Sequence, residues 1–528
     1  MHDRTSRSGS SRLLAPPFPH QAYRAGERRD LALLLRHYRG EWWVTSLLLL
    51  LVALAVRAPL FGNPVIQVDE QFYLLVGDRM LHGAWPFVDI WDRKPIGLFL
   101  LYAALRPFSG TGILAYQIAA TVSVAATAFV IERMARRIAP PAAALTASIL
   151  YILCLPMMGG IGGQAPVFYN LPVAIAALIV MQLADSSNET TAQRNLTARG
   201  AMAMLLIGIA IQIKYSAIFE GFFFGIVLAF MSFRHRTNLL ATLAETAFWA
   251  SLALAPTALA FAIYWLAGHG AEFVFANFWS IFLRSDDPPE QTIGRLWGII
   301  AFTAPLVIAG GWAPFVAGRD QLRGPLAFAL AWAIVAYAAV LAFGSYFDHY
   351  ALPLYLPLCV AAAPLFGNRR FGRWVGLVLI AVALVAGVLN VRRDIRKRGD
   401  WATVAPMVAM IGQHPKGCVY IFDGDPIVYH LTQSCLLTRW PFPAHLSNRR
   451  EAEALGINAT AETRRILAQH PAWVISTRGW NGGITNRADA AMVNQALHDH
   501  YRLVMEIPIG PYVRQLYRLE PEQLAQRN

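Results

Sequence analysis

The chain has 528 residues, of which 56% are hydrophobic and only 15% are charged. A soluble protein of this length needs a largely polar surface, so the composition excludes an ordinary soluble enzyme. The formal net charge is +13, but no basic patch with interleaved aromatic residues accompanies it, which argues against a nucleic-acid partner.

The N-terminal segment is polar and rich in Arg, Ser and Pro. It lacks the compact apolar core and the cleavage site of a signal peptide. We therefore interpret residues 1–40 as a cytoplasmic tail that leads into an interfacial helix near 30–40.

Long charge-free segments follow this tail. The segment 138–184 contains no Asp, Glu, Lys or Arg and is long enough for two membrane spans, since one span needs about 20 mostly apolar residues. The sequence therefore predicts an all-α polytopic membrane protein with its membrane module over 41–391. The eleven predicted spans lie near residues 43–61, 112–132, 141–156, 166–184, 200–214, 217–233, 243–267, 296–317, 325–343, 350–366 and 373–391.

Basic residues between the spans indicate the orientation, because cytoplasmic loops carry an excess of Lys and Arg. The Arg-rich connections fall on one side if the N-terminus is cytoplasmic: ERMARR (132–137), FRHR (233–236), AGRDQLR (317–323) and NRRFGR (368–373). The remaining loops then face outward: 62–111, 157–165, 268–295 and 344–349. An odd number of spans places the C-terminus outward as well, although the basic segment 391–400 conflicts with that orientation.

The first outer loop, 62–111, gathers acidic residues between two apolar segments. Asp69 and Glu70 begin a helical pattern, DEQFYLLVGDRML. The helix dipole stabilises carboxylates in a first turn by about 0.3–1 kcal/mol each. The pair is therefore either the start of an interfacial helix or an ionised general base at the membrane face, and the spacing alone leaves both interpretations open.

A second acidic cluster, FVDIWDRKP, follows in the same loop. Asp89 and Asp92 are three residues apart, and Trp91 lies between them. The residue before a proline resists the helical conformation, so Lys94 ends an extended segment before an apolar run. Lys94 is then either a snorkelling lysine or a ligand of a lipid phosphate. Trp91 suits either a sugar face or the membrane interface.

Further ionisable residues lie at membrane depth or in later outer loops. Lys214 and Glu220 stand between two apolar stretches, where they either neutralise each other across a bend or leave Lys214 to reach a ligand phosphate. His349 and Tyr350 lie at the outer end of a span, and Arg284 lies in another outer loop, so all three are candidates to line one outward site.

The remaining motifs are less specific. The segment GGIGGQAP (159–166) lacks the GxGxxG spacing and the strand–helix context of a phosphate loop, so we interpret it as a flexible outer turn. Cys418 and Cys435 form a disulfide or remain thiols with similar prior odds. The sequence indicates no definite cofactor, but the acidic residues of the first outer loop allow a divalent cation bound through oxygen atoms. Its candidate ligands are Asp69, Glu70, Asp89 and Asp92.

From about residue 400 the composition becomes that of a soluble domain. Strand-like and helix-like segments alternate and predict a small α/β domain over 392–528, which the orientation places in the periplasm. The strand-like segments are GCVYIFDG, PAWVISTR, YRLVMEIP and YVRQLYRL.

The order of these motifs resembles the GT-C glycosyltransferases. The DE pair at a helix start, then VDIWDRKP, a membrane-dipping run and the later HYALPLYLPL are similar to a bacterial branch of that family. This branch is related to the protein mannosyltransferases and the aminoarabinose transferases. The resemblance covers roughly residues 43–391 and implies a polyprenyl-phosphate sugar as donor, with transfer at the periplasmic face and inversion at the sugar.

The resemblance also implies roles for individual residues. Asp69 would be the catalytic carboxylate, with Glu70 beside it. Many relatives carry a second acidic residue in the outer loop between spans three and four, where this chain has Gln164. A mechanism with two carboxylates would therefore rely on Asp89 or Asp92, which with Trp91 support the site. The candidates for the donor phosphate site are Lys94, Lys214, Arg284, His349 and Tyr350.

These observations together predict an integral glycosyltransferase of the bacterial inner membrane. Its partners would be the bilayer, a polyprenyl-phosphate sugar and a lipid or glycan acceptor of the envelope. A transporter or flippase for lipid-linked sugars is the alternative from another class, and a non-catalytic membrane protein with the same fold is a third. Transporters bury their charges at mid-membrane, whereas most acids here lie in outer loops.

Overall fold

The computed structural model describes residues 42–184, 189–236, 238–318, 324–479 and 485–520. The predicted cytoplasmic tail and its interfacial helix lie outside these residues. The described residues from Thr45 onward belong to a single compact unit, which includes both the membrane helices and a C-terminal sheet.

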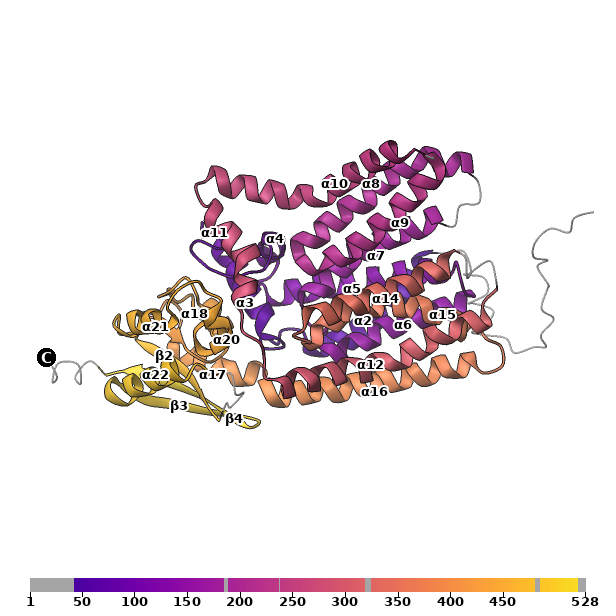
Figure 1. Ribbon diagram of the computed structural model, residues 1–528. Helices are drawn as coiled ribbons and strands as arrows, with labels where there is room; N and C mark the ends of the chain where they lie inside the picture. The colour runs from indigo at the N-terminus through magenta and orange to yellow at the C-terminus, as the bar shows by residue number, and fades with distance from the viewer. Residues whose placement is uncertain (1–41, 185–188, 237, 319–323, 480–484, 521–528) are drawn as a thin grey trace, which may run out of the picture. The chain divides into compact units, whose positions relative to one another are not determined.

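Within the described residues, eleven helical segments are long and apolar enough to cross a membrane, which confirms the predicted polytopic architecture. Among them α5, α6 and α7 lie side by side, as Figure 1 shows. The helices of these segments are α2 (Trp42–Arg57), α5 (Ile113–Ala135), α6 (Pro141–Cys154), α7 (Ala165–Ala184), α8 (Glu189–Ile213), α9 (Ile218–Arg236), α10 (Leu239–Leu266), α12 (Pro289–Val316), α14 (Pro325–Phe343), α15 (Tyr355–Phe366) and α16 (Gly372–Arg398).

Several spans differ from the prediction at their ends; α12, for example, begins at Pro289 and not near 296. Helix α16 continues past residue 391 to Arg398, because the basic residues there are good helix formers. The span predicted from residue 350 begins at Asp348 as a 3-10 helix, Asp348–Leu354, and becomes α-helical only at Tyr355. Pro353 lies inside that first turn and has no backbone N–H to give to an α-helical hydrogen bond.

The loop between α2 and α5, which the sequence predicts to face outward and which keeps the name first outer loop, carries two helices, α3 (Val68–Leu81) and α4 (Ile96–Leu105), which pack against each other. Asp69 and Glu70 lie in the first turn of α3, as the sequence predicts. Pro95 precedes α4 with an extended backbone, which ends the segment that carries Lys94. A later outer loop contains the short helix α11 (Gly270–Val274).

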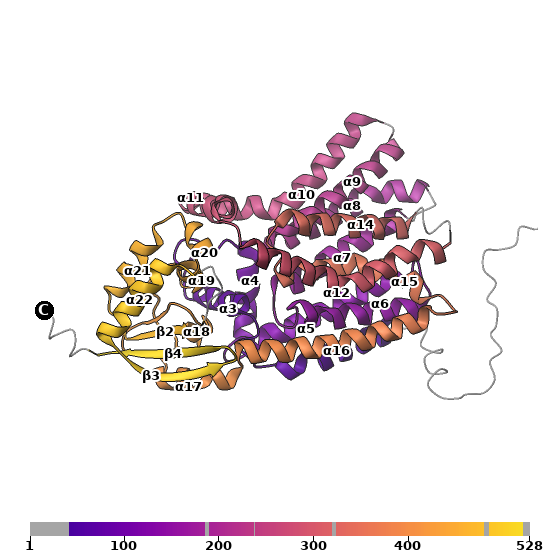
Figure 2. The same cartoon turned by 60° about the horizontal axis from the view of Figure 1, so that its bottom comes forward.

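The C-terminal part contains a four-stranded mixed sheet in the order β1-β2-β4-β3. Figure 2 shows β2, β4 and β3 in this order, with α21 and α22 beside them. β1 and β2 are parallel, and the other neighbours are antiparallel. The four predicted strands are all present, which confirms the α/β class. The strands are β1 (Val419–Ile421), β2 (Trp473–Arg478), β3 (Tyr501–Ile509) and β4 (Tyr512–Leu519).

Short helices surround this sheet. Cys418 and Cys435 form a disulfide that ties the start of β1 to the segment after α18, so the pairing that the sequence left open is present. The helices are α17 (Trp401–Ile411), α18 (Ile427–Thr432), α19 (Ala444–Ser447), α20 (Arg449–Glu453), α21 (Ala459–Leu467) and α22 (Arg487–His500).

Candidate active site

Asp69 lies half-buried in the first turn of α3, surrounded by residues from four other segments. The side-chain amide of Gln164 donates a hydrogen bond to Asp69 Oδ2 at 3.3 Å. Lys94, Lys214 and His349 lie close enough to interact with it electrostatically. Burial alone would raise the pKa of Asp69, but Lys94 and the Gln164 bond help to lower it below its ordinary value. Asp69 is therefore ionised at neutral pH, as a general base must be.

Lys94 stands at the end of the extended segment before α4. Its Nζ lies 3.9 Å from Asp92 Oδ1 and 5.7 Å from the ring centroid of Tyr73. Burial lowers the pKa of Lys94, but Asp92 and Asp69 together raise it above its ordinary value. Lys94 therefore remains a cation between two carboxylates, and Asp92 is the neighbour that holds it in place.

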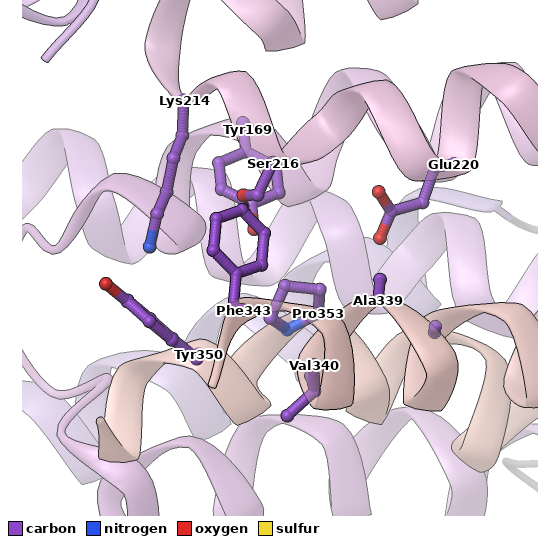
Figure 3. Close-up of a pocket in the computed structure, with 10 residues that line it drawn as sticks. Tyr169, Lys214, Ser216, Glu220, Ala339, Val340, Phe343, Tyr350 and Pro353 are labelled. Atoms are coloured by element: carbon purple, nitrogen blue, oxygen red, sulfur yellow. Dashed lines mark hydrogen bonds between the residues drawn. The ribbon is translucent and has the colours of Figure 1, made fainter. Parts of the chain in front are cut away.

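A cavity beside this group is lined by α7, α9, α14 and the 3-10 helix at Asp348–Leu354. Lys214 lies between α8 and α9, where the backbone is extended and not helical. It points toward Tyr350, as Figure 3 shows, with Nζ 4.2 Å from the ring centroid. Glu220 lies farther along α9, and no ion pair joins it to Lys214 within the described structure. Lys214 and Glu220 thus line one cavity from separate positions and do not form the bent ion pair.

The glycine-rich segment after α6 is not the flexible outer turn that the sequence predicted. It is buried throughout. The guanidinium group of Arg57 donates hydrogen bonds to the carbonyl oxygens of Gly160 and Gly162, at 2.6 and 2.5 Å. Because a charged donor fixes both carbonyl oxygens, the turn is held in place. The signal in the sequence was the single basic residue at the end of the first apolar run, LLLLLVALAVR.

The same turn faces Glu70, whose side chain is fully buried. Burial raises the pKa of Glu70 to about 7, so this carboxyl titrates near neutral pH while Asp69 stays ionised. A Cβ atom at Gly162 would lie 2.1 Å from Glu70 Oε2, so only glycine permits this close approach.

Gly162→Ala is expected to destabilise the protein, since the added methyl group collides with the Glu70 carboxylate. Overpacking of this kind costs about 1–3 kcal/mol, so we expect a lower midpoint of thermal unfolding in detergent. Gly294→Ala, in α12, is the matched control, because no atom lies within 4 Å of a Cβ at that position. An unchanged midpoint for Gly162→Ala would contradict the close packing.

Two residues predicted to support the site make other contacts. Asp89 is exposed, and its Oδ2 accepts a hydrogen bond from the backbone N–H of Trp85 at 2.7 Å, which closes a turn. Trp91 is buried, and its backbone N–H donates to the carbonyl oxygen of Arg439 at 2.7 Å. Its ring centroid lies 4.9 Å from that of His445. Trp91 thus packs against the C-terminal domain.

The acidic residues of the first outer loop do not assemble into a metal site. In the part of the chain that the structure describes, no three His, Cys, Asp or Glu side chains are grouped as metal ligands. Asp69 lies beside the cation Lys94 and the Gln164 amide, Glu70 faces a turn, and Asp92 faces Lys94. A divalent cation here would be repelled by the lysines, so these residues do not fit the cation that the sequence allowed.

Comparison with known proteins rests on structure. No protein-family model and no curated protein matches the chain. It is similar to ArnT from Cupriavidus metallidurans bound to undecaprenyl phosphate, at 17% identity and a TM-score of 0.58, over 90% of this chain and 98% of that one. For ArnT in the apo state the TM-score is 0.54 at 17% identity, over 90% and 97%. The apo oligosaccharyltransferase of Archaeoglobus fulgidus gives 0.50 at 10% identity, over 88% and 73%.

ArnT, an aminoarabinose transferase, and the archaeal oligosaccharyltransferase are membrane glycosyltransferases with one fold, GT-C. The chain has the GT-C fold. This confirms at the level of the fold the resemblance carried by the DE pair, the VDIWDRKP segment and HYALPLYLPL. In this GT-C chain, Asp69 and Lys94 both lie in the first outer loop.

The C-terminal domain of this GT-C chain also reaches the outer loops, which sequence reasoning missed. Glu451 on α20 accepts hydrogen bonds from both Arg93 and Arg284. Burial alone would raise the pKa of Glu451, but these two arginines lower it to about 2. One carboxylate therefore ties the C-terminal domain to two outer loops and holds Arg93, the neighbour of Lys94. The predicted phosphate ligand Arg284 is thus bound to Glu451.

Glu451→Gln is expected to loosen this connection in the GT-C chain. The neutral amide leaves two mostly buried arginines without their charge partner, which costs about 3 kcal/mol. We expect a lower midpoint of thermal unfolding and faster cleavage by protease in the outer loops. Glu453→Gln is the matched control, since Glu453 lies on the same helix and is 47% exposed. Equal stability of both variants would show that the contact carries little energy.

Proposed function

We propose that the chain transfers a sugar from a polyprenyl-phosphate donor to a lipid or glycan acceptor of the bacterial envelope. The transfer would take place at the periplasmic face of the inner membrane and invert the sugar. One observation carries the proposal: the ionised carboxylate of Asp69 stands in the first turn of α3, beside the cation Lys94 and near the amino group of Lys214. The likeness in fold to ArnT, solved with undecaprenyl phosphate bound, supports it.

The donor would lie with its phosphate near the cations. In the proposed reaction the bond from the anomeric carbon to the phosphate oxygen breaks, and its electron pair stays on that oxygen. The leaving polyprenyl phosphate needs no proton at neutral pH, but its charge needs cations placed in advance. Lys94 supplies that charge, Lys214 adds to it when protonated, and His349 and Tyr350 lie near the same two lysines. Arg284 would join them only by exchanging Glu451 for the phosphate.

The acceptor hydroxyl would approach from the opposite face of the sugar. As its oxygen bonds to the anomeric carbon, its proton passes to Asp69. A positioned general base of this kind typically contributes about 10²–10⁴-fold to the rate. Gln164 holds the Asp69 carboxylate in place, and it lies in the loop where the family resemblance implies a second acid. One ionised carboxylate is enough for this reaction, so the amide at that position is consistent with catalysis.

We further infer that the N-terminus is cytoplasmic and that residues 392–528 form a periplasmic domain. The Arg-rich connections support this orientation. The disulfide between Cys418 and Cys435 supports it independently, because disulfides persist in oxidising compartments such as the periplasm.

A deletion strain tests the proposed function in the cell. Envelope glycolipids and glycans would be compared by mass spectrometry between the wild type, the deletion strain and the complemented strain. We expect the deletion to remove one sugar modification and to raise the pool of a polyprenyl-phosphate sugar, with both effects reversed by complementation. An unchanged glycan profile and an unchanged donor pool would contradict the proposal.

A further inference from the structure

The loop that precedes His349 and Tyr350 makes a buried contact with the C-terminal domain. Arg450, on α20, is 7% exposed, and its Nη2 donates a hydrogen bond to Ser345 Oγ at 2.7 Å. Its Nη1 pairs with the carboxylate of Asp287, just before α12. The planar guanidinium group presents N–H groups to both acceptors at once, so one side chain joins the loop before α12 to the loop after α14.

A second arginine strengthens this contact. Arg295, on α12, donates from Nη1 to Asp287 Oδ2 at 2.6 Å and to the carbonyl oxygen of Ser345 at 3.3 Å. The Asp287 carboxylate is buried and accepts from Arg295 and Arg450 together. Ser345 is therefore held through its carbonyl oxygen from α12 and through its hydroxyl group from the C-terminal domain.

The same two arginines lie against the ring of Phe347. Cζ of Arg295 is 4.3 Å from the ring centroid, and Cζ of Arg450 is 5.9 Å from it, which is within the range of cation–π attraction. Phe347 directly precedes the 3-10 helix, and its carbonyl oxygen accepts a hydrogen bond from the backbone N–H of Tyr350 at 2.8 Å. The position of Phe347 therefore sets the first turn of that helix.

This first turn carries two groups of the proposed donor site. The ring of His349 lies parallel to that of Phe347, at 6.0 Å between centroids, and 4.8 Å from that of Tyr350. The Tyr350 ring in turn faces Lys214, whose Nζ is 4.2 Å from its centroid (Figure 3). A shift of the turn would move the Tyr350 ring away from Lys214 and leave α3 in place. Contacts thus run without a break from Arg450 to the donor side.

We propose that Arg450 is a positioning residue for the donor. From the C-terminal domain it fixes Ser345 and Phe347, and through them it holds the Tyr350 ring against Lys214 where the polyprenyl phosphate would bind. This inference rests on the proposed function. It assigns a part in donor binding to a side chain that is 105 residues from Ser345 in the sequence and does not itself touch the donor.

The alternative is that Arg450 only attaches the C-terminal domain to the membrane helices. These two roles differ in their kinetic effects. A variant with fewer correctly assembled molecules has a lower apparent kcat and an unchanged KM. A variant with a displaced donor site has a higher KM for the donor and binds polyprenyl phosphate more weakly.

The test compares Arg450→Lys, Tyr350→Ala and the double variant, each as the full chain in lipid nanodiscs. Lysine keeps the positive charge but has no fork of N–H groups for Asp287 and Ser345 together. Ser345→Ala removes a single hydrogen bond and covers the case in which Arg450→Lys does not fold. Arg449→Met is the matched control, since Arg449 lies on the same helix and is 68% exposed.

Two measurements report on the donor side. Native mass spectrometry gives the Kd of undecaprenyl phosphate. Sugar transfer to an envelope extract gives kcat and the KM for polyprenyl-phosphate sugars extracted from host membranes. We expect Arg450→Lys to raise this Kd and this KM by about tenfold each, with a smaller change in kcat. Ser345→Ala should shift both in the same direction by a smaller factor, and Arg449→Met should match the wild type.

The double variant tests whether Arg450 acts through the Tyr350 ring. Substitutions along one chain of contacts do not add, so the double variant should have the donor KM of Tyr350→Ala alone. Effects that multiply in the double variant would overturn the inference, and so would wild-type values of KM and Kd in both Arg450→Lys and Ser345→Ala. A wild type that binds no undecaprenyl phosphate and transfers no sugar would overturn the proposed function itself.

Discussion

Asp69→Asn is expected to abolish sugar transfer while the donor still binds. The amide has nearly the same shape as the carboxylate, and its carbonyl oxygen can accept the hydrogen bond that Gln164 donates. It cannot accept the proton of the acceptor hydroxyl, so the contribution of the base, about 10²–10⁴-fold, is lost. We expect kcat to fall by at least about 100-fold with the KM for the donor nearly unchanged. The measurement is the rate of sugar transfer in nanodiscs at varied donor concentration.

Glu290→Gln is the matched control for this substitution. Glu290 is also an acidic residue in the first turn of a helix that follows an outer loop, and it is exposed. Its replacement should leave kcat and KM at the wild-type values. Full activity of Asp69→Asn would remove Asp69 from the role of base, whereas an equal loss in Glu290→Gln would point to a general effect of charge at the membrane face.

Lys94→Met is expected to have the second-largest effect, because it removes the cation that acts most strongly on Asp69 and lies 3.9 Å from Asp92. The loss of one preorganised group that stabilises developing charge typically costs about 10²–10³-fold in kcat. The same substitution should change the pH dependence of transfer. Lys94 is the strongest of the groups that lower the pKa of Asp69, and without it burial raises that pKa. The variant should therefore lose activity at a higher pH than the wild type as the pH falls.

The pH profile separates a role at Asp69 from a purely structural role of Lys94. Ionised Asp69 is the active form, so activity is present above its pKa and is lost as the pH falls through it. Glu70 titrates near pH 7 in both proteins, so the test is the difference between their profiles: as the pH falls, Lys94→Met should lose activity at a higher pH than the wild type. Lys416→Met, at an exposed position of the C-terminal domain, should follow the wild type. Parallel profiles for Lys94→Met and the wild type would contradict the coupling.

Local patterns in the sequence predicted the elements and much of the first outer loop. Charge-free runs long enough to cross a bilayer predicted the spans, and short strand-like segments predicted the strands. Both signals depend on the burial of residues that are neighbours in the sequence. The placement of Asp69 in a first helical turn and of Lys94 before α4 follows from local rules for acidic residues and prolines.

Contacts between distant segments were not predictable in the same way. Arg57 and Gly162 are 105 residues apart, and Arg93 and Glu451 are 358 apart, so no short pattern joins them. The segment RREAE, which contains Glu451, has the composition of an ordinary exposed helix. Only the fold brings it to the outer loops. The break at Lys214 also depends on context, because the spacing to Glu220 allowed either a bent pair or two separate groups.

The measurement that tests the central claim most directly is the release of polyprenyl phosphate by the purified chain in nanodiscs. A nanodisc encloses no second compartment, so a transporter or flippase cannot change the donor there. With polyprenyl-phosphate sugars and an envelope extract, we expect the wild type to release polyprenyl phosphate and to form a sugar-modified acceptor in equal amounts, and Asp69→Asn to do neither. A donor that remains intact with the wild type would contradict the assignment of the chain as a glycosyltransferase.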